Sequence, residues 1–200
     1  MSGLRAQVNA LLARLSAGDD VKSTLEEVLD VISDASGCDS VGIRWRAGED
    51  YPYFVTRGFG RDFVVREGPL CERDAAGLVL RQPDGSAQLA CLCGAVVSGK
   101  ADTRWPFFTK GGSFWTNTAQ TLGSELKKKD LGFRVRAYCV EVGYEVVAAI
   151  PLRTAGSVYG VLQMNCRETG SFTANSIEEY EDIASDIAAA VSSVMEDQAA

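Results

Sequence analysis

Histidine is missing from the whole of the 200-residue sequence. Imidazole is the proton carrier of Ser-His-Asp and Cys-His nucleophilic sites, a frequent ligand of zinc and haem, and the phosphate acceptor of histidine kinases. Side chains of this chain therefore cannot build any of those sites. The absence removes most common enzyme mechanisms, and we expect the chain not to be an enzyme.

Long apolar runs are also missing. No stretch reaches the roughly 18 consecutive apolar residues that a membrane helix needs, and residues 1–20 alternate apolar and polar positions, unlike a signal peptide. The six cysteines then belong to a reducing compartment, where free thiols, metal ligands or redox groups are more common than a disulfide framework. These features predict a cytoplasmic protein without a membrane partner.

Concentrated positive charge is the third absence. Lys and Arg number 20 against 27 Asp and Glu, which leaves a formal charge of −7. The only dense basic run, residues 127–129, is flanked by Glu125 and Asp130, as in a solvated helix face. Because phosphate binding needs a concentrated basic surface, we expect no nucleic-acid partner.

Helical periodicity is clearest at the two ends of the chain. Gly18 and Gly37 end the first two apolar stripes, Asp19 or Asp20 can cap the second helix, and Thr173 can cap the last. A weaker pattern predicts a short helix over residues 117–129. The stripes comprise Leu4, Val8, Leu11, Leu12 and Leu15, then Val21, Leu25, Val28, Leu29 and Ile32, and finally Ile177, Tyr180, Ile183, Ile187, Val191 and Val194.

Four segments have the composition of strands. Residues 41–45 alternate like a half-buried strand and residues 53–55 fit its hairpin partner, whereas residues 146–152 and 158–165 are apolar strands joined by a tight turn at 155–157. Residues 58–130 show little periodicity, which is typical of binding loops. The order of elements predicts an α+β domain, an antiparallel sheet with helices on one face.

Local sequences in the last third resemble the GAF family. Residues 143–153 are similar to the GAF strand that ends in apolar-Pro-Leu, residues 158–165 to the following strand, and Phe172-Thr173 to the start of the last helix. The resemblance implies a GAF-like antiparallel sheet of about six strands flanked by N- and C-terminal helices. It divides the chain into an N-terminal signalling and dimerisation helix, residues 1–18, and a sensory domain, residues 19–197.

The middle of the chain resembles the cysteine-bearing GAF domains of bacterial sensor histidine kinases. The resemblance implies a sensory part in a two-component system, with a small-molecule or redox signal and an output kinase or other effector domain as partner. The matching pieces are Leu70-Cys71, Cys91-Leu92-Cys93-Gly94, Pro106-Phe107-Phe108-Thr109, Gly112-Ser113-Phe114-Trp115-Thr116-Asn117, and Arg136-Ala137-Tyr138-Cys139 leading to Gly143-Tyr144-Glu145.

Some known GAF ligands are disfavoured by departures from the family patterns. Bilin-binding relatives attach the pigment to a cysteine that histidine normally follows, and haem-binding relatives commonly use an axial histidine, yet this chain has none. The asparagine-lysine-phenylalanine-aspartate-glutamate signature of cyclic-nucleotide-responsive relatives is also missing. The ligand therefore stays open.

The cysteines Cys71, Cys91, Cys93 and Cys139 form the candidate metal site. If the segment around the Cys-x-Cys pair is a strand, both of its thiols project from one face. Four thiolates would select zinc or an iron–sulfur cluster, although structural zinc sites favour a longer spacing within a pair. A redox-active thiol pair and plain packing are the alternatives. For Cys38 and Cys166 we expect packing.

An aromatic segment, residues 105–108 together with Phe114 and Trp115, is the candidate lining of a ligand pocket. Its rings either line an apolar pocket or close the core beneath a long loop. Arg134, Arg136 and Lys110 either hold an anionic ligand or pair with surface acids. The predicted ligand-binding residues are Trp105, Phe107, Phe108, Phe114, Trp115 and Arg136.

The terminal helices predict a homodimer. Leu4, Val8, Leu11 and Leu15, and Ile183, Ile187, Val191 and Val194 form seams wider than one small sheet needs, although packing within the chain is the alternative. The main functional hypothesis is a regulatory input domain. Two others stay open: a cysteine-dependent enzyme of the free methionine sulfoxide reductase type, and a dimerisation module with an empty pocket.

Overall fold

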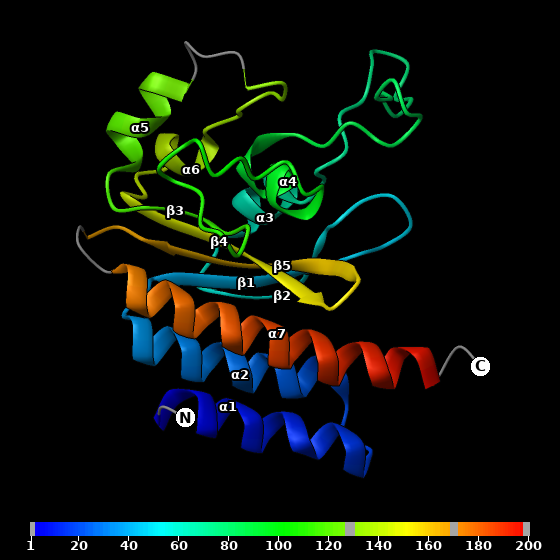
Figure 1. The fold of residues 1–200 in the computed structure, drawn as a ribbon, viewed down its shortest axis with the longest axis vertical. Coiled ribbons are helices and arrows are strands. Elements are labelled where there is room, and N and C mark those ends of the chain that lie inside the picture. Colours follow the sequence, from blue (N-terminus) through cyan, green and yellow to red (C-terminus); the bar gives the residue numbers. More distant parts are fainter. Residues whose placement is uncertain (1–2, 127–130, 169–171, 198–200) are drawn as a thin grey trace.

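A central antiparallel sheet divides the molecule into a helical layer on one side and a layer of loops and short helices on the other (Figure 1). The computed structural model describes residues 3–126, 131–168 and 172–197. The elements in chain order are α1 (Gly3–Leu12), a 3-10 helix (Ala13–Ala17), α2 (Val21–Ser36), β1 (Ser40–Trp45), β2 (Tyr53–Arg57), α3 (Arg61–Glu67), α4 (Cys91–Val97), β3 (Phe114–Thr116), α5 (Ala119–Leu126), α6 (Tyr138–Glu141), β4 (Val146–Thr154), β5 (Ser157–Cys166) and α7 (Ala174–Asp197).

The sheet has the strand order β2-β1-β5-β4-β3, and every neighbouring pair is antiparallel. The hairpin between β4 and β5 is confirmed: Thr154 pairs with Ser157, which leaves a two-residue turn at Ala155 and Gly156. Five strands are found in the described part of the chain, one fewer than the GAF resemblance implied. The predicted α+β class with flanking helices is confirmed.

Helices α2 and α7 cover one face of the sheet, and α1 lies outside them (Figure 1). The carboxylate of Asp20 caps α2 by accepting a hydrogen bond from the Ser23 backbone N–H at 2.8 Å, and Gly37 ends the helix with a φ of 67°. Arg5 of α1 forms ion pairs with Asp182 and Asp186 of α7. These ion pairs join α1 to α7 on the side of the helical layer that faces away from the sheet.

The apolar seam predicted to drive dimerisation is largely covered within the chain. Val8, Leu15, Ile183, Ile187 and Val191 are buried against the sheet and the neighbouring helices. Leu4, Leu11 and Val194 are half-buried against the same core. The seam residues thus have packing partners in a single chain, and the homodimer stays a prediction.

The other face of the sheet carries a second apolar cluster beneath α3, α4, α5 and α6. Alternation along the strands sorts the side chains: Ile150, Leu162 and Met164 face the helical layer, whereas Val147 and Val161 face the loops. The segment that carries the Cys-x-Cys pair is α4, a helix, so the conditional prediction of a strand there is wrong. None of the described helices has the length and apolar character needed to cross a membrane.

An arm formed by residues 72–89 projects from this layer (Figure 1). Its three short segments pair in a closed ring, because Glu72 N–H donates to Gln88 O, Gln88 N–H to Leu80 O, and Leu80 N–H to Glu72 O, each at 2.8 Å. At the base of the arm, Ala90 N–H donates to Leu70 O at 2.8 Å. This ring fixes the position from which α4 starts.

Cys38 and Cys166 form a disulfide, which corrects the expectation that both residues only pack. Cys38 follows the end of α2 and Cys166 is the last residue of β5, so the bond extends the β1–β5 pairing beyond its final pair, Ser40 and Asn165. Both side chains are buried in the core beneath the helical layer.

Two glycines of the β4–β5 hairpin give a matched test of the register in which β1 pairs with β5. A Cβ at position 160 would lie 1.9 Å from the backbone oxygen of Arg44, whereas a Cβ at position 156 would meet nothing within 4 Å. Because backbone atoms cannot move aside, Gly160→Ala should lower the free energy of unfolding by about 3 kcal/mol or more, and Gly156→Ala should change it by less than about 1 kcal/mol. Denaturant unfolding measures both, and equal effects would contradict the β1–β5 register.

Candidate functional site

An apolar cavity of about 50 Å³ lies on the loop side of the sheet, between β3, β4 and helices α4, α5 and α6. Besides three cysteine thiols, Thr116 contributes the one polar side chain of its lining. The lining residues are Cys91, Leu92, Cys93, Phe114, Thr116, Ala119, Leu122, Gly123, Leu126, Val135, Ala137, Cys139, Val140 and Val147. Small-molecule sites are typically apolar with a few placed polar groups, so this cavity is the candidate site.

Two short helices bring the three thiols to the cavity. Cys91 starts α4, and its N–H donates to Arg134 O at 2.6 Å, which attaches the helix to the loop that leads to α6. Gly94 allows α4 to lie against the arm, because a Cβ there would be 2.8 Å from Leu89 Cβ. Cys139 comes from α6. All three cysteines carry free thiols.

The backbone is strained at two positions in the lining. Cys91 has a φ of 66° and Ala137 a φ of 58°, and no other described residue except glycine has a positive φ. Such conformations cost on the order of 1–3 kcal/mol and persist where the surrounding structure imposes them, often at ligand sites. Both residues line the cavity, and each carries or adjoins a short helix that holds a thiol.

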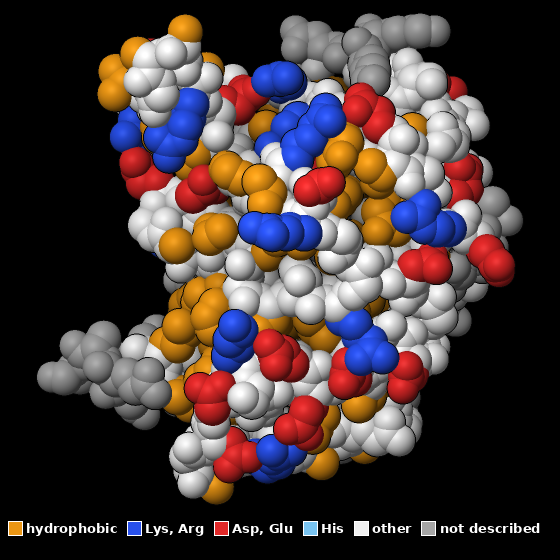
Figure 2. Space-filling model, turned by 180° about the vertical axis from the view of Figure 1, so that it is seen from behind, with side chains coloured by type: hydrophobic (Ala, Val, Ile, Leu, Met, Phe, Trp, Pro, Cys, Tyr) orange, Lys and Arg blue, Asp and Glu red, His pale blue; other side chains and the backbone are white. Residues whose placement is uncertain are grey.

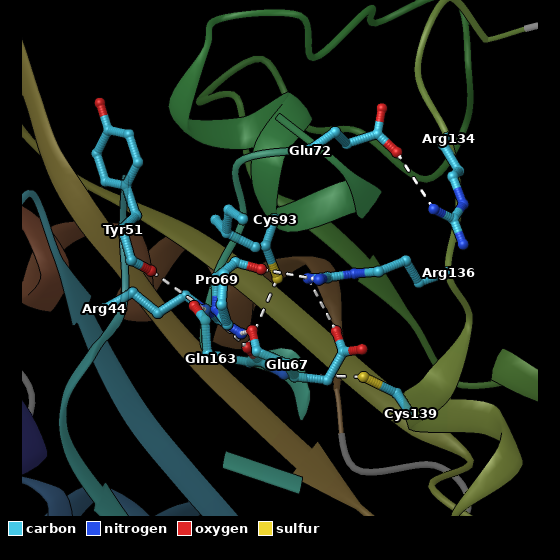
Figure 3. A network of polar contacts seen from close by, with 12 residues as sticks. Arg44, Tyr51, Glu67, Pro69, Glu72, Cys93, Arg134, Arg136, Cys139 and Gln163 are labelled. Atoms are coloured by element: carbon cyan, nitrogen blue, oxygen red, sulfur yellow. Dashed lines mark hydrogen bonds and ion pairs between the residues drawn. The ribbon is translucent and has the colours of Figure 1, made fainter. Parts of the chain in front are cut away.

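The side-chain amide of Gln163, on β5, connects two of the thiols (Figure 3). Its Oε1 accepts from the Cys93 thiol at 3.6 Å, and its Nε2 donates to the Cys139 sulfur at 3.8 Å. The same Oε1 also accepts from Arg44 Nε at 3.2 Å and from the Tyr53 hydroxyl at 2.8 Å. Gln163 is therefore the centre of a buried polar network on the cavity face of the sheet.

Two arginines hold the segment of residues 67–69 from opposite sides (Figure 3). Arg44 donates to the backbone oxygens of Glu67 and Gly68, each at 2.8 Å. Arg136 donates to Pro69 O at 2.8 Å, and its guanidinium lies 3.1 Å from the buried Glu67 carboxylate. Removing one partner of a buried ion pair leaves an uncompensated charge, so this pair fixes the loop before α6 to the end of α3.

Burial keeps the thiols of Cys93, Cys139 and Cys71 protonated at neutral pH. Burial raises the pKa of Cys93 to about 12 and also raises the pKa of Cys139. Burial likewise raises the pKa of Cys71 to about 11. Because the thiolate is the nucleophile, these cysteines react slowly in this arrangement.

Cys71 lies apart from the other three predicted metal ligands. Its thiol donates to Glu49 O at 3.3 Å, and the charged groups that act on it are those of Asp50, Arg73, Glu49 and Arg81. In residues 3–126, 131–168 and 172–197, no group of three or more His, Cys, Asp or Glu side chains is arranged to hold a metal ion. The structure thus does not assemble the four-thiol site predicted from the sequence.

The six predicted ligand-binding residues are divided between several places. Phe114 lines the cavity, Phe107 packs against it with a ring-centroid distance of 5.9 Å, and Trp105 and Phe108 border a separate surface pocket. Trp115 packs against the core beneath the helical layer, on the other face of the sheet. Arg136 is directed to Glu67 and Pro69. The aromatic segment therefore mainly closes the core, the alternative interpretation of the sequence.

The polar groups beneath the thiols come from Gln163, Arg44 and Asn165, which the sequence patterns did not reveal as site residues. In the sequence each of them alternates with apolar residues, a pattern that ordinarily marks the solvent face of a strand. Here that face is covered, and all three are at most 1% exposed. The available signal was the presence of Gln163 and Asn165 inside a strand that was expected to be buried.

Comparisons with known proteins support the fold. No family model matches the chain, and no curated protein matches it. Among solved structures, the GAF domain of a phosphoenolpyruvate-protein phosphotransferase from Coxiella burnetii is similar over 100% of both chains, with a TM-score of 0.61 and 14% identity. A GAF domain/HD domain protein from Geobacter sulfurreducens is similar over 91% of this chain and 98% of its own, with a TM-score of 0.58 and 17% identity.

A third similar structure is an enzyme. The free methionine-R-sulfoxide reductase from Neisseria meningitidis, solved with its substrate, is similar over 96% of this chain and 89% of its own, with a TM-score of 0.58 and 14% identity. At this level of identity the likeness establishes the architecture. The chain has the GAF fold.

The raised thiol pKa predicts how stability depends on pH. Unfolded cysteines titrate near pH 8.5, whereas the pKa of folded Cys93 is about 12. The folded state thus keeps its proton longer, and this stabilisation is full below about pH 8.5 and is lost as the pH rises towards 12. Cys93→Ala should flatten the alkaline fall of the free energy of unfolding, measured by denaturant titration at increasing pH. Tyr53, whose pKa burial also raises, is common to both proteins; parallel curves would contradict the prediction.

Proposed function

We propose that this chain is the regulatory input domain of a signal-transduction protein, which receives its signal in the thiol-lined cavity and transmits it through α7. The GAF fold supports a regulatory role, because the similar structures include a domain of a two-component sensor histidine kinase protein from Sinorhizobium meliloti, with a TM-score of 0.58 and 12% identity over 91% of this chain. An output kinase or other effector in the cytoplasm is the partner in this proposal.

The observation that carries the proposal is an apolar cavity beside strained backbone. Protein interiors are close-packed, and voids larger than a water molecule are few. Here the cavity of about 50 Å³ exceeds the roughly 10–15 Å³ that one water needs. The two left-handed non-glycine residues of the described chain both line it. A receptive site accounts for these features together, whereas packing alone accounts for neither.

A continuous set of contacts joins the cavity to the helical layer. Gln163 contacts Cys93 and Cys139 on the cavity side of β5. Its neighbours in the strand, Leu162 and Met164, face the opposite side and belong to the core that α7 covers. A ligand that moves the thiols therefore also alters the contacts of β5 and the surface on which α7 packs. It acts as a signal if its affinity differs between the two arrangements.

Xenon is a suitable probe, since it binds dry apolar cavities without a chemical requirement of its own. We expect xenon to shift the methyl resonances of Leu122, Leu126 and Val140 and to change amide hydrogen exchange along α7. Ala119→Leu, which fills the cavity, should abolish both effects; Ala10→Leu, the same change at an exposed position of α1, should preserve them.

Two outcomes would contradict the regulatory proposal. Absence of methyl shifts under xenon pressure would show that the cavity is not receptive. Methyl shifts without any change of exchange in α7 would show that occupancy of the cavity is not transmitted to the helical layer.

A cysteine-dependent reductase of free methionine sulfoxide is the second candidate. Three free thiols around one cavity and the likeness to the Neisseria enzyme favour it. The reaction would convert a sulfoxide and two thiols into a thioether, a disulfide and water, and it needs a reactive thiolate. The raised pKa of Cys93 and Cys139 and the apolar lining disfavour this chemistry and a charged amino-acid substrate.

A turnover assay separates the two functions. With a dithiol reductant and free methionine-R-sulfoxide, we expect no methionine beyond the amount formed by the reductant alone, for the wild-type chain and for Cys93→Ser alike. Sustained methionine formation that Cys93→Ser abolishes and Cys71→Ser preserves would establish the enzyme instead.

A further inference from the structure

The turn of residues 109–113 on the loop side holds a carboxylate that belongs to the helical layer. Oε1 of Glu181, on α7, accepts hydrogen bonds from the Thr109 hydroxyl and, at 2.6 Å, from the Ser113 hydroxyl. The turn leads directly into β3, the last strand at one edge of the sheet. Glu181 therefore joins the loop layer to α7 around this edge, and we call this contact the Glu181 latch.

The backbone of the turn fits the carboxylate closely. Thr109 N–H donates to Ser113 O at 2.9 Å, and Gly112, with a φ of 85°, takes the left-handed conformation that favours glycine. The Ser113 N–H donates to Thr109 Oγ1 at 3.0 Å, which leaves the hydrogen of that hydroxyl to Glu181. A Cβ at position 111 would overlap the Glu181 carboxylate, so only glycine leaves the space that the carboxylate occupies.

One peptide bond separates the latch from the candidate cavity. Ser113, which is fully buried, is followed by Phe114, the first residue of β3, whose ring lines the cavity. Neighbouring side chains of a strand point to opposite faces, so Phe114 faces the loops while Ser113 and Trp115 face the helical layer. A ligand that displaces the Phe114 ring therefore also moves the Ser113 hydroxyl that binds α7.

The edge strand β3 is also easier to displace than β5. β5 has ten residues and lies between β1 and β4, whereas β3 has three residues and is paired in the sheet with β4 alone. The outer side of β3 is bonded within its own segment, where Trp115 N–H donates to Phe107 O at 3.1 Å. Elements with few hydrogen bonds to their surroundings open at a lower free energy than central strands. The route through β3 thus needs less energy than the route through β5 described above.

We propose that the Glu181 latch transmits occupancy of the cavity to α7. This inference rests on the regulatory function proposed above, and it names the residues through which the signal leaves the site. When a ligand moves Phe114, the carboxylate either follows the Thr109 and Ser113 hydroxyls and carries α7 with it, or loses both donors. Either response changes the first half of α7, and a ligand whose affinity differs between the two arrangements shifts the equilibrium between them.

Xenon gives the readout, with variants of two carboxylates on the same helix. Glu181→Ala removes the acceptor, whereas Glu181→Gln keeps an acceptor oxygen on a side chain of the same length. Glu178→Ala is the control, because Glu178 is exposed. We expect all variants to keep the xenon-induced methyl shifts of the cavity. In Glu181→Ala alone, the xenon-induced change of amide exchange in the first half of α7 should fall about fivefold or more, as loss of a typical allosteric coupling does. A purely structural role would lower stability with and without xenon alike and would leave this difference unchanged.

A second variant breaks the latch without removing a polar group. Gly111→Ala places a methyl group where the Glu181 carboxylate lies, and Gly111 has no positive φ that alanine would strain. Gly156→Ala is its control, since a Cβ there would meet nothing within 4 Å. We expect Gly111→Ala to lose the α7 response as Glu181→Ala does, and Gly156→Ala to keep it. Thermal unfolding checks that each variant is folded, and if Glu181→Ala is not, Gly111→Ala decides.

An α7 response of wild-type size in Glu181→Ala or Gly111→Ala would overturn the latch proposal, and so would equal losses in Glu181→Gln and Glu181→Ala. In each of these cases the wild-type response remains, so the regulatory function stands and only the latch is wrong. If xenon shifts the cavity methyls of the wild type without changing exchange in α7, the regulatory function and the latch fail together.

Discussion

The hydrogen bond between Arg44 and Gln163 organises the cavity half of the molecule. It places a guanidinium group, 1% exposed, on the inner side of a sheet whose surroundings are largely apolar. Such a group must be fully paired, and its further partners are the backbone oxygens of residues 51, 67 and 68 and the ring of Tyr53. The loop above the sheet is therefore held in place by one buried charge. The same glutamine accepts from the Cys93 thiol of α4 at Oε1 and donates to the Cys139 sulfur of α6 from Nε2.

The two faces of the sheet carry different kinds of side chain. Towards α2 and α7, the strands present mainly apolar side chains, among them Ile150, Leu162 and Met164, which form one core with those helices. Towards the loops, they present Arg44, Gln163 and Asn165, and the covering helices are short, begin at left-handed residues in two cases, and border the apolar cavity. Charged side chains of both signs are interspersed on the molecular face seen in Figure 2.

The sequence revealed the elements whose signals are local. The β4–β5 hairpin was predictable from two apolar runs around a short turn, and α2 from an apolar stripe between Asp20 and Gly37. The segment of Cys91 and Cys93 was ambiguous, because a short apolar run fits a buried strand or a buried helix equally well. The Cys38–Cys166 bond, across 128 residues, and the separation of Cys71 from the other thiols depend on tertiary arrangement. Periodicity could not predict either.

Magnitudes favour the cavity as a switch. Two left-handed non-glycine residues store about 1–3 kcal/mol each, and allosteric coupling between sites typically amounts to about 1–3 kcal/mol. A ligand that lets Cys91 or Ala137 relax in only one arrangement would thus gain enough differential affinity to shift an equilibrium by roughly tenfold or more. The same energy spread over the aliphatic core would change nothing, because that core has a single packed arrangement. The strained residues lie beside thiols that contact β5, and the opposite face of β5 supports α7. Relief of the strain at the cavity can therefore be transmitted to α7.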